Sequence, residues 1–219
     1  MALLIARHGE TALNVARVVQ PADTVLSARG ELQAAALGER LAREYRVRSI
    51  VSSDLPRALQ TAERVARCLG VPVTESSEWR ERNFGHLRGR AYETLGFDPV
   101  AMREAPEDGE SLAQFEARVA RACEALVETL DGHKPEDDML VVTHGLVLDT
   151  LLGHHIHGAT GNRTVANTAL VVALCQDRAL RWALGPCTAH LNAMSPIPAP
   201  ERVQAHSENE FQNVLLRDI

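Results

Sequence analysis

The sequence predicts an α/β domain with a largely parallel sheet. Short apolar segments alternate along the chain with longer segments of helical periodicity, which is the pattern of parallel strands joined by helices. The chain has 219 residues, of which 45% are hydrophobic and 24% charged, so it can bury one continuous core. No internal repeat interrupts the alternation. We therefore expect a single domain over residues 1–190, followed by a C-terminal tail over residues 191–219.

The first half of the chain is expected to contribute three strands and two helices. The strands cover residues 2–7, 49–53 and 71–74. The helices cover residues 27–45 and 55–69. Ser27 suits an N-cap, Pro56 a position in the first turn and Gly70 a C-terminal stop. The apolar side of the first helix is expected to comprise Leu32, Ala36, Leu37 and Leu41.

The segment from residue 75 to residue 109 interrupts this regular pattern. It contains several helix and strand breakers, namely Gly85, Gly89, Gly96, Pro99, Pro106 and Gly109. We expect an insertion of loops and short helices that lies over the sheet. Insertions of this kind often carry function.

The second half returns to longer elements. A helix capped by Ser111 is expected to continue to Gly132. Residues 139–143 are continuously hydrophobic, as in a central strand, and a helix follows over residues 146–155. The remaining expected strands, which pair as an antiparallel hairpin at the sheet edge, cover residues 168–175 and 180–184. The proline-rich tail is expected to be extended, with a short helix near residues 211–216.

Composition and charge argue against several kinds of partner. The longest apolar runs are far too short to span a membrane. The apolar start of the chain lacks a basic flank and a cleavage site, so we expect a buried strand, no signal peptide and a cytoplasmic protein. The net charge of −6 argues against nucleic acid or an anionic membrane surface as a partner.

Cysteine and histidine patterns do not favour a metal site. The four cysteines are Cys68, Cys123, Cys175 and Cys187, and none forms a C-x-x-C pair. This spacing suits buried, reduced thiols. The group of His154, His155 and His157 has no carboxylate at ligand spacing, and adjacent histidines at a helix end point in different directions. We therefore expect no metal and no other cofactor.

Arginine is the dominant cation of this chain. Of the 23 basic residues only Lys134 is a lysine, which leaves 22 arginines. A GC-rich genome accounts for most of that total, so the position of individual arginines is more informative than their number. The planar guanidinium group suits recognition of phosphate and carboxylate.

Polar clusters follow three of the expected strands. They are Arg7-His8-Gly9-Glu10-Thr11, Ser52-Ser53-Asp54-Leu55-Pro56-Arg57 and Thr143-His144-Gly145. The carboxyl ends of strands in an open α/β sheet form the usual ligand crevice, so these clusters are expected to converge. A site that gathers two arginines and two histidines is costly unless an anion neutralises it, and a phosphate dianion matches it.

The clusters belong to a longer series of motifs that resembles the histidine phosphatase superfamily, the phosphoglycerate-mutase-like proteins. The further motifs are Arg57-Ala58, Gln60-Thr61-Ala62, Arg80-Glu81, Phe84-Gly85, Gly109-Glu110-Ser111 and Val142-Thr143-His144-Gly145. They occur in family order and cover roughly residues 2–190. The resemblance implies a three-layer α/β/α sandwich, no metal and a covalent phosphohistidine intermediate.

The resemblance also implies roles for individual residues. His8 matches the nucleophile and Glu81 matches the general acid and base. The residues that match the phosphoryl-binding positions are Arg7, Asn14, Arg57 and His144. Nearby arginines are expected to lower the pKa of His8 and keep its imidazole neutral, and desolvation is expected to raise the pKa of Glu81.

Each of these residues also has a structural interpretation. A lone histidine at a strand end is more often a hydrogen-bonded structural group, Glu81 could be a solvated loop acid, and Asn14 could be a helix cap. The chain departs from the family pattern at Gln20-Pro21-Ala22, where many relatives have a glycine.

Three functions remain open at this point. The first is a phosphomonoesterase that acts on a small phosphorylated metabolite, and the second is phosphoglycerate mutase-type phosphoryl transfer. Phe84 stands where mutases have tyrosine, and only 19 residues separate Arg90 from Glu110, so the long basic insertion of a cofactor-dependent mutase is absent. The third is an inactive module that binds phosphorylated ligands, whose expected signature would be the loss of His8 or Glu81.

Substrate selection and assembly are less constrained by the sequence. The candidates for selecting an anionic substrate are the arginines of the insertion, Arg82, Arg88, Arg90 and Arg103. Taken singly, each has the alternative of a solvated surface charge. An edge hairpin would permit a homodimer.

Overall fold

The structure is a computed structural model that describes residues 1–131, 137–159 and 165–192. Its strands are β1 (Ala2–Arg7), β2 (Val47–Ser52), β3 (Val73–Glu75), β4 (Asp138–Thr143), β5 (Ile156–His157), β6 (Leu170–Gln176) and β7 (Ala179–Cys187). They form one sheet in the order β3-β2-β4-β1-β6-β7-β5. Strands β1 to β4 pair in parallel, whereas β6 is antiparallel to β1 and β7. The predicted α/β fold with a mostly parallel sheet is confirmed, with β4 in a central position.

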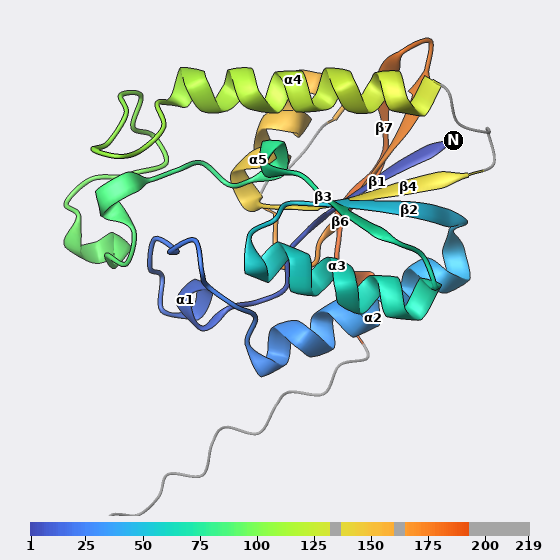
Figure 1. The fold of residues 1–219 in the computed structure, drawn as a ribbon, viewed down its shortest axis with the longest axis horizontal. Coiled ribbons are helices and arrows are strands. Elements are labelled where there is room, and N and C mark those ends of the chain that lie inside the picture. The colour runs from blue at the N-terminus through green and yellow to red at the C-terminus, as the bar shows by residue number, and fades with distance from the viewer. Residues whose placement is uncertain (132–136, 160–164, 193–219) are drawn as a thin grey trace, which may run out of the picture.

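Helices cover both faces of this sheet. They are α1 (Ala12–Val15), α2 (Ala28–Glu44), α3 (Pro56–Leu69), α4 (Leu112–Asp131) and α5 (Gly145–Thr150). Figure 1 shows α4 above the edge-on sheet and α2 and α3 below it. The result is the three-layer α/β/α sandwich that the sequence motifs implied.

The alternation of side chains along β1 builds two separate cores. Leu3 and Ile5 belong to the core under α4 and α5, whereas Leu4 and Ala6 belong to the core against α2 and α3. All four side chains are fully buried. A strand that is buried on both faces is apolar without interruption, as this strand is up to its last residue, Arg7.

Local signals set the helix ends where the sequence predicted them. The hydroxyl of Ser27 accepts a hydrogen bond from the Gly30 amide at 3.0 Å, which caps α2. Gly70 ends α3 in the left-handed conformation, with φ of 68°. One expectation for α2 was wrong, since Leu32 is 52% exposed while Leu37 and Leu41 are fully buried. Five residues of helix turn through about 500°, so Leu32 lies roughly 140° away from Leu37.

Several other elements differ from expectation. Strand β2 begins two residues earlier than predicted, β6 begins two residues later, and β7 continues three residues further. Strand β3 begins at Val73, two residues later than predicted. The helix predicted over residues 146–155 is α5 followed by a π-helical turn, Leu151–His155. The hairpin β6–β7 does not form the complete edge of the sheet, because β5 pairs with β7 at Leu180 and Arg181. A two-residue strand leaves no periodicity for a sequence to reveal.

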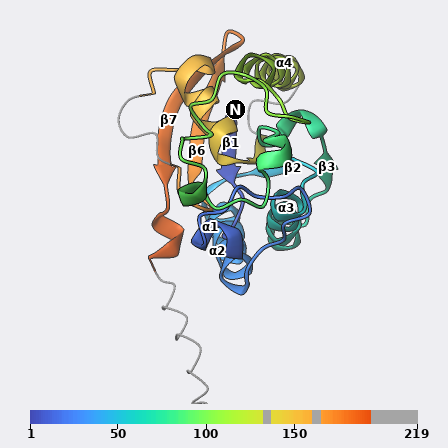
Figure 2. The same cartoon turned by 90° about the vertical axis from the view of Figure 1, so that its left-hand side faces the viewer.

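The segment over residues 75–109 contains short helices and a small core of its own. Its 3-10 helices are η1 (Ser77–Trp79), η2 (Gly85–Leu87) and η3 (Tyr92–Thr94). Phe84 and Leu87 pack with Val19 from the loop after α1. In Figure 2 this segment crosses the end of the sheet that faces the viewer. The insertion therefore covers the ends of β1, β2 and β4.

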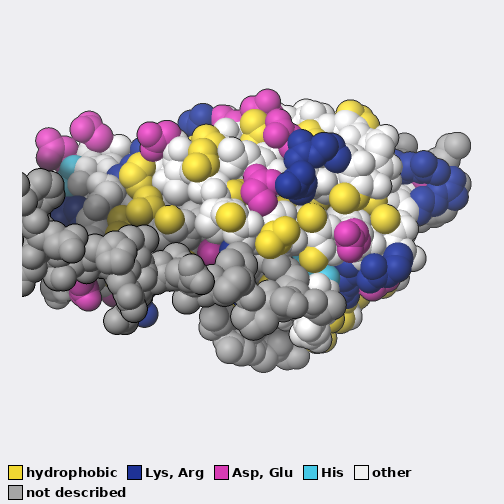
Figure 3. Space-filling model, turned by 90° about the horizontal axis from the view of Figure 1, so that it is seen from below, with side chains coloured by type: hydrophobic (Ala, Val, Ile, Leu, Met, Phe, Trp, Pro, Cys, Tyr) yellow, Lys and Arg dark blue, Asp and Glu magenta, His cyan; other side chains and the backbone are white. Residues whose placement is uncertain are grey.

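Other expectations concern the surface and the tail. None of the helices in the described part of the chain is long and apolar enough to cross a membrane. On the face seen in Figure 3, arginine side chains stand in small groups interspersed with acidic and hydrophobic ones. Apart from η5 (Ala189–Leu191) and Asn192, the tail and its expected short helix lie outside the described residues.

Candidate active site

Hydrogen bonds between strand ends bring the three polar clusters together. The His8 amide donates to the Thr143 carbonyl at 2.9 Å, just beyond the parallel pairing of β1 with β4. The Ser53 amide donates to the Val142 carbonyl at 3.0 Å, just beyond the pairing of β2 with β4. The carboxyl ends of β1, β2 and β4 therefore end side by side, and their polar residues face one region. A cavity of about 460 Å³ opens there.

His8 lies at the base of this cavity with only 2% of its surface exposed. Its Nδ1 atom lies 2.7 Å from the Gly9 carbonyl oxygen. Because a carbonyl can only accept, Nδ1 must carry the proton and Nε2 must carry the lone pair of the neutral ring. Burial and the charges of Arg7 and Arg57 lower the pKa of His8 well below 6.5. The imidazole is thus held neutral in one tautomer.

Two glycines allow the loop after β1 to approach α2 closely. A Cβ atom on Gly9 would lie 2.6 Å from the Gly30 carbonyl oxygen, and one on Gly30 would lie 2.1 Å from the Glu10 carbonyl oxygen. The Gly9 amide donates to the Thr61 hydroxyl on α3 at 2.9 Å. The loop that carries His8 is therefore fixed against both helices of the lower layer.

Arg7 and Arg57 supply the positive charge of the site. Arg7 donates through Nη1 to the Val165 carbonyl at 2.6 Å, and Arg57 donates to the Pro21 carbonyl at 3.3 Å. The buried Nε atoms of both have no partner among the described residues. Burial lowers the pKa of both groups, that of Arg57 to about 10. Two buried guanidinium groups that retain unused donors form a site for an anion.

His144 stands beside His8 at the end of β4. The centroids of the two rings are 5.2 Å apart, and His144 is fully buried. Its Nε2 atom lies 2.9 Å from the Ser53 hydroxyl, and its Nδ1 atom has no partner among the described residues. Burial and the charge of Arg57 lower the pKa of His144 well below 6.5. A neutral imidazole here can donate one hydrogen bond without adding a positive charge.

Glu81, a half-buried residue, contributes a carboxyl group from the insertion. One of its oxygens accepts from the Leu146 amide at 3.1 Å and the other from the Arg82 amide at 3.0 Å. Burial raises the pKa of Glu81, although these two amides and the charge of Arg57 oppose the shift. The group lines the same cavity as His8. A carboxyl group with a raised pKa can both give and take a proton.

Asn14 is both a cap and a member of the cavity wall. Its Oδ1 accepts from the Thr11 amide at 3.1 Å, its own amide donates to the Thr11 hydroxyl at 3.0 Å, and the two bonds form a capping box. The side chain of Asn167 donates to the same Oδ1 at 3.2 Å and to the His8 carbonyl at 3.1 Å. These bonds use the Oδ1 atom and the backbone amide of Asn14, and they leave its side-chain Nδ2 for a ligand.

The four arginines suggested for substrate selection occupy different places. Arg88 is half-buried and lines the cavity. Arg82 also lines it but is 2% exposed, and its guanidinium donates to three backbone carbonyls, those of Val100, Glu104 and Glu110. Arg90 and Arg103 are exposed and do not line the cavity. Of these four arginines, Arg82 and Arg88 line the cavity. The guanidinium of Arg82 is bound to backbone carbonyls, so Arg88 is the better candidate for contacting a substrate.

Some lining residues gave no signal in the sequence. Arg17 lies in the turn after α1 and Tyr92 begins the 3-10 helix η3, and both line the cavity. Asn167, which holds His8 and Asn14, lies in a turn before β6 that carries no motif. Thr61 was part of a family motif, but its bond to the His8 loop could not be read from spacing.

The histidines suggested as a weak metal alternative lie away from this cavity. The rings of His154 and His155 are 6.5 Å apart. Across the ranges 1–131, 137–159 and 165–192, no three His, Cys, Asp or Glu side chains are grouped as a metal site requires.

Comparison with known proteins identifies the family. The model of the histidine phosphatase superfamily (branch 1) matches residues 3–184. A Salmonella arizonae protein named "Probable phosphoglycerate mutase GpmB" is 35% identical over 158 residues, which cover 68% of this chain and 71% of the relative. The Citrobacter koseri protein of the same name is 36% identical over the same shares.

Solved structures share the fold at lower identity. A mycobacterial glucosyl-3-phosphoglycerate phosphatase in complex with VO3 is 28% identical, with a TM-score of 0.70 over 83% of this chain and 96% of that one. Bacillus stearothermophilus YhfR is also 28% identical, with a TM-score of 0.73 over 87% and 98%. The match to the family model over most of the chain, together with these relatives, shows that the chain belongs to branch 1 of the histidine phosphatase superfamily.

Proposed function

We propose that the protein hydrolyses a small phosphomonoester through a phosphohistidine intermediate at His8. The observation that carries this proposal is the state of His8, a neutral imidazole whose Nδ1 proton is committed to the Gly9 carbonyl. Nε2 is then the nucleophile, next to the guanidinium groups of Arg7 and Arg57. A buried base with that geometry is suited to attack phosphorus.

The first half of the proposed reaction transfers the phosphoryl group to the enzyme. Nε2 of His8 forms a bond to phosphorus as the bond from phosphorus to the ester oxygen breaks. The departing oxygen takes the proton of Glu81, whose raised pKa keeps that proton available. Arg7 and Arg57 stabilise the charge on the non-bridging oxygens, with donors that are already in place.

The second half returns the enzyme to its starting state. Glu81, now ionised, removes a proton from a water molecule that attacks phosphorus. The bond between phosphorus and Nε2 breaks, orthophosphate leaves, and Glu81 is again protonated. Asn14 and His144 are proposed to donate hydrogen bonds to the phosphoryl oxygens.

The cavity favours a substrate that is larger than phosphate but still small. Its volume of about 460 Å³ exceeds the needs of one phosphoryl group, and part of its wall is apolar. The apolar side chains of the wall are Leu13, Val18, Val19, Ala22, Leu55, Phe84, Val100 and Leu146. We infer a small phosphorylated metabolite as the substrate, with Arg88, which lines the cavity, as its candidate selector.

The relatives named as mutases make phosphoryl transfer to a second hydroxyl the alternative function. A mutase must exclude water from its phosphohistidine, whereas a phosphatase must admit it. The test follows orthophosphate release and isomerisation of 3-phosphoglycerate in parallel, with His8→Ala as the blank. We expect net phosphate release from a panel of phosphomonoesters. Isomerisation without phosphate release would establish the mutase instead, and activity that survives in the blank would refute the mechanism.

A further inference from the structure

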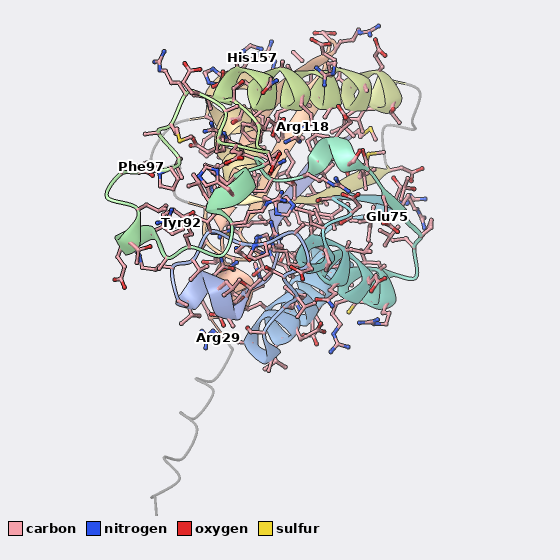
Figure 4. All side chains as sticks on the ribbon, turned by 60° about the vertical axis from the view of Figure 1, so that its left-hand side comes forward. Arg29, Glu75, Tyr92, Phe97, Arg118 and His157 are labelled. Atoms are coloured by element: carbon pink, nitrogen blue, oxygen red, sulfur yellow. The ribbon has the colours of Figure 1, made fainter. Side chains whose placement is uncertain are left out.

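We propose that Arg118, on α4, is a positioning residue for Glu81, and that it acts through the backbone of residues 78–81. The proposal rests on the proposed function, because it assigns Glu81 the proton transfers described above. Arg118 makes no contact with His8 or the phosphoryl-binding residues in the hydrogen bonds of the described chain. Figure 4 shows Arg118 on the side of α4 that faces the insertion.

The guanidinium of Arg118 is fixed by Glu110. Nε lies 3.0 Å from one carboxylate oxygen of Glu110, and Nη2 lies 2.8 Å from the other. The side chains are 13% and 16% exposed, so this two-point pair is shielded from water. Arg118 also stacks on Phe115, with its guanidinium carbon 5.3 Å from the ring centroid. These contacts hold the group in one orientation.

The rest of the guanidinium binds the backbone that leads to Glu81. Nη1 donates to the Glu78 carbonyl at 2.8 Å and to the Arg80 carbonyl at 2.9 Å, and Nη2 lies 3.5 Å from the Glu81 carbonyl. All five guanidinium protons are therefore engaged by Glu110 and this segment. The Glu110 carboxylate also accepts from the Asn83 amide at 3.3 Å. The pair thus binds both sides of Glu81.

The same segment is attached to the sheet at its other end. The Thr143 hydroxyl, at the end of β4, donates to the Trp79 carbonyl at 2.7 Å. Arg80 forms a two-point ion pair with Asp54, which follows β2. Residues 78–81 contain no regular element longer than a 3-10 turn, so the position of Glu81 depends on these side-chain bonds and on Trp79, which is buried in the same core as the apolar side of α4. Without Arg118, the carbonyls of Glu78, Arg80 and Glu81 would lose their bonds to α4, whereas the packing of Trp79 and the bonds to the sheet would remain.

A small displacement of Glu81 should affect some substrates more than others. An alkyl leaving group needs the proton of Glu81, whereas dinitrophenolate departs without one. A residue that only supports the fold would lower the turnover of both substrates alike. A residue that positions the acid should lower kcat/KM for the alkyl ester selectively, because kcat/KM reports the step in which that ester bond breaks.

The experiment compares Arg118→Lys with wild type, using glycerol phosphate and dinitrophenyl phosphate. Lysine keeps the charge but cannot bind Glu110 at two points and three carbonyls at once. We expect kcat/KM for glycerol phosphate to fall about 10- to 100-fold, less than the about 10²- to 10⁴-fold of complete loss of acid catalysis, and that for dinitrophenyl phosphate to fall less than about threefold. Equal losses for the two esters would overturn the proposal.

Two further variants separate the possible failures. Arg121→Lys is the matched control, because Arg121 lies one turn further along α4 and is largely exposed. Within the described residues, its one ion pair is with the Glu78 carboxylate at 3.6 Å. The kcat/KM of Arg121→Lys should equal that of wild type for both esters. Glu81→Gln must show the same selectivity as Arg118→Lys, only larger. If Glu81→Gln lowers kcat/KM equally for both esters, the proton-transfer role of Glu81 in the proposed function fails. If only Arg118→Lys lacks the selectivity, the positioning role fails.

A second variant tests the proposal in case Arg118→Lys does not fold. Glu110→Gln removes the charge that fixes the guanidinium but leaves Arg118 itself in place. It should show the same selective loss for glycerol phosphate, to a smaller extent. A Glu110→Gln protein with unchanged selectivity would also contradict the proposal.

Discussion

The rings of His8 and His144 lie 5.2 Å apart with their planes at 58°, in a site that also contains two guanidinium groups. Neither histidine has a carboxylate as a hydrogen-bond partner in the described chain, and burial lowers the pKa of both. Protonating either ring would place a third positive charge beside Arg7 and Arg57. The site therefore holds both imidazoles neutral, which makes its stability depend on pH.

The free energy of unfolding should fall as the solution becomes acidic below pH 6.5. In that range the unfolded chain protonates both histidines and the folded protein does not, until the lowered folded-state pKa is reached. Each histidine contributes up to about 1.4 kcal/mol per pH unit in this window. Replacing His144 by asparagine should remove about half of the joint contribution. Denaturant titrations at several pH values between 7.5 and 5 test this prediction. If the free energy of unfolding changed equally with pH in wild type and variant, the prediction would be contradicted.

Orthophosphate should stabilise the folded protein. It occupies the donors of Arg7 and Arg57 and binds only the folded state, so a concentration of 100 times Kd adds about 2.7 kcal/mol. In Arg57→Met the increase in Tm with phosphate should be lost. Arg67→Met is the matched control, because Arg67 is an exposed residue of the same helix, and it should retain the increase. An unchanged phosphate effect in Arg57→Met would remove Arg57 from the site.

Glu81→Gln should accumulate phosphoenzyme from an ester with a good leaving group. Formation of the phosphohistidine then needs no acid, whereas its hydrolysis still needs Glu81 as a base. General base assistance is worth about 10²- to 10⁴-fold, so steady-state turnover should fall by that order. Intact-mass measurements at alkaline pH, where phosphohistidine survives, should detect the adduct. His8→Ala should show none, and Glu81→Gln turnover equal to that of wild type would end the assignment.

The pH dependence of kcat/KM should show an acidic limb set by His8 and an alkaline limb set by Glu81. His8 must be neutral to attack, and since its pKa is lowered, the acidic limb should lie below pH 6.5. Glu81 must be protonated, and since its pKa is raised, the alkaline limb should lie above pH 4.5. In Glu81→Gln the alkaline limb should disappear while the acidic limb remains. Loss of the acidic limb instead would indicate that the two assignments are reversed.

The regular elements of the fold could be predicted because their signals are local. Ser27, Pro56 and Gly70 mark helix ends through local capping and backbone preferences. The continuous apolar sequences of β1 and β4 predict that both strands are buried. Strand β5 could not be predicted, since its two residues pair with β7 through tertiary contact alone. The exposed position of Leu32 shows a similar limit, because apolar composition does not fix which side of a helix packs.

The candidate site was predictable where motifs follow strands and less so in the insertion. The ends of β1, β2 and β4 meet because parallel strands place their carboxyl ends at one edge, so His8, Arg57 and His144 could be grouped in advance. Arg82 was suggested for substrate selection, yet three backbone carbonyls occupy its guanidinium. Sequence spacing cannot distinguish an arginine that supports a loop from one that faces a ligand.

Gly30→Ala should impair activity through the loop that carries His8. The new Cβ would lie 2.1 Å from the Glu10 carbonyl oxygen, so the loop must move away from α2. Gly38→Ala is the control in the same helix, where the new Cβ would lie 2.9 Å from the Cys68 sulfur, and neither residue lines the cavity. Overpacking costs about 1–3 kcal/mol, so both variants should lower Tm. Only Gly30→Ala should also lower kcat/KM, by at least about tenfold, because a misplacement of about 1 Å at a nucleophile can cost that much or more. Unchanged kcat/KM in Gly30→Ala would show that the close approach of the loop to α2 does not orient His8.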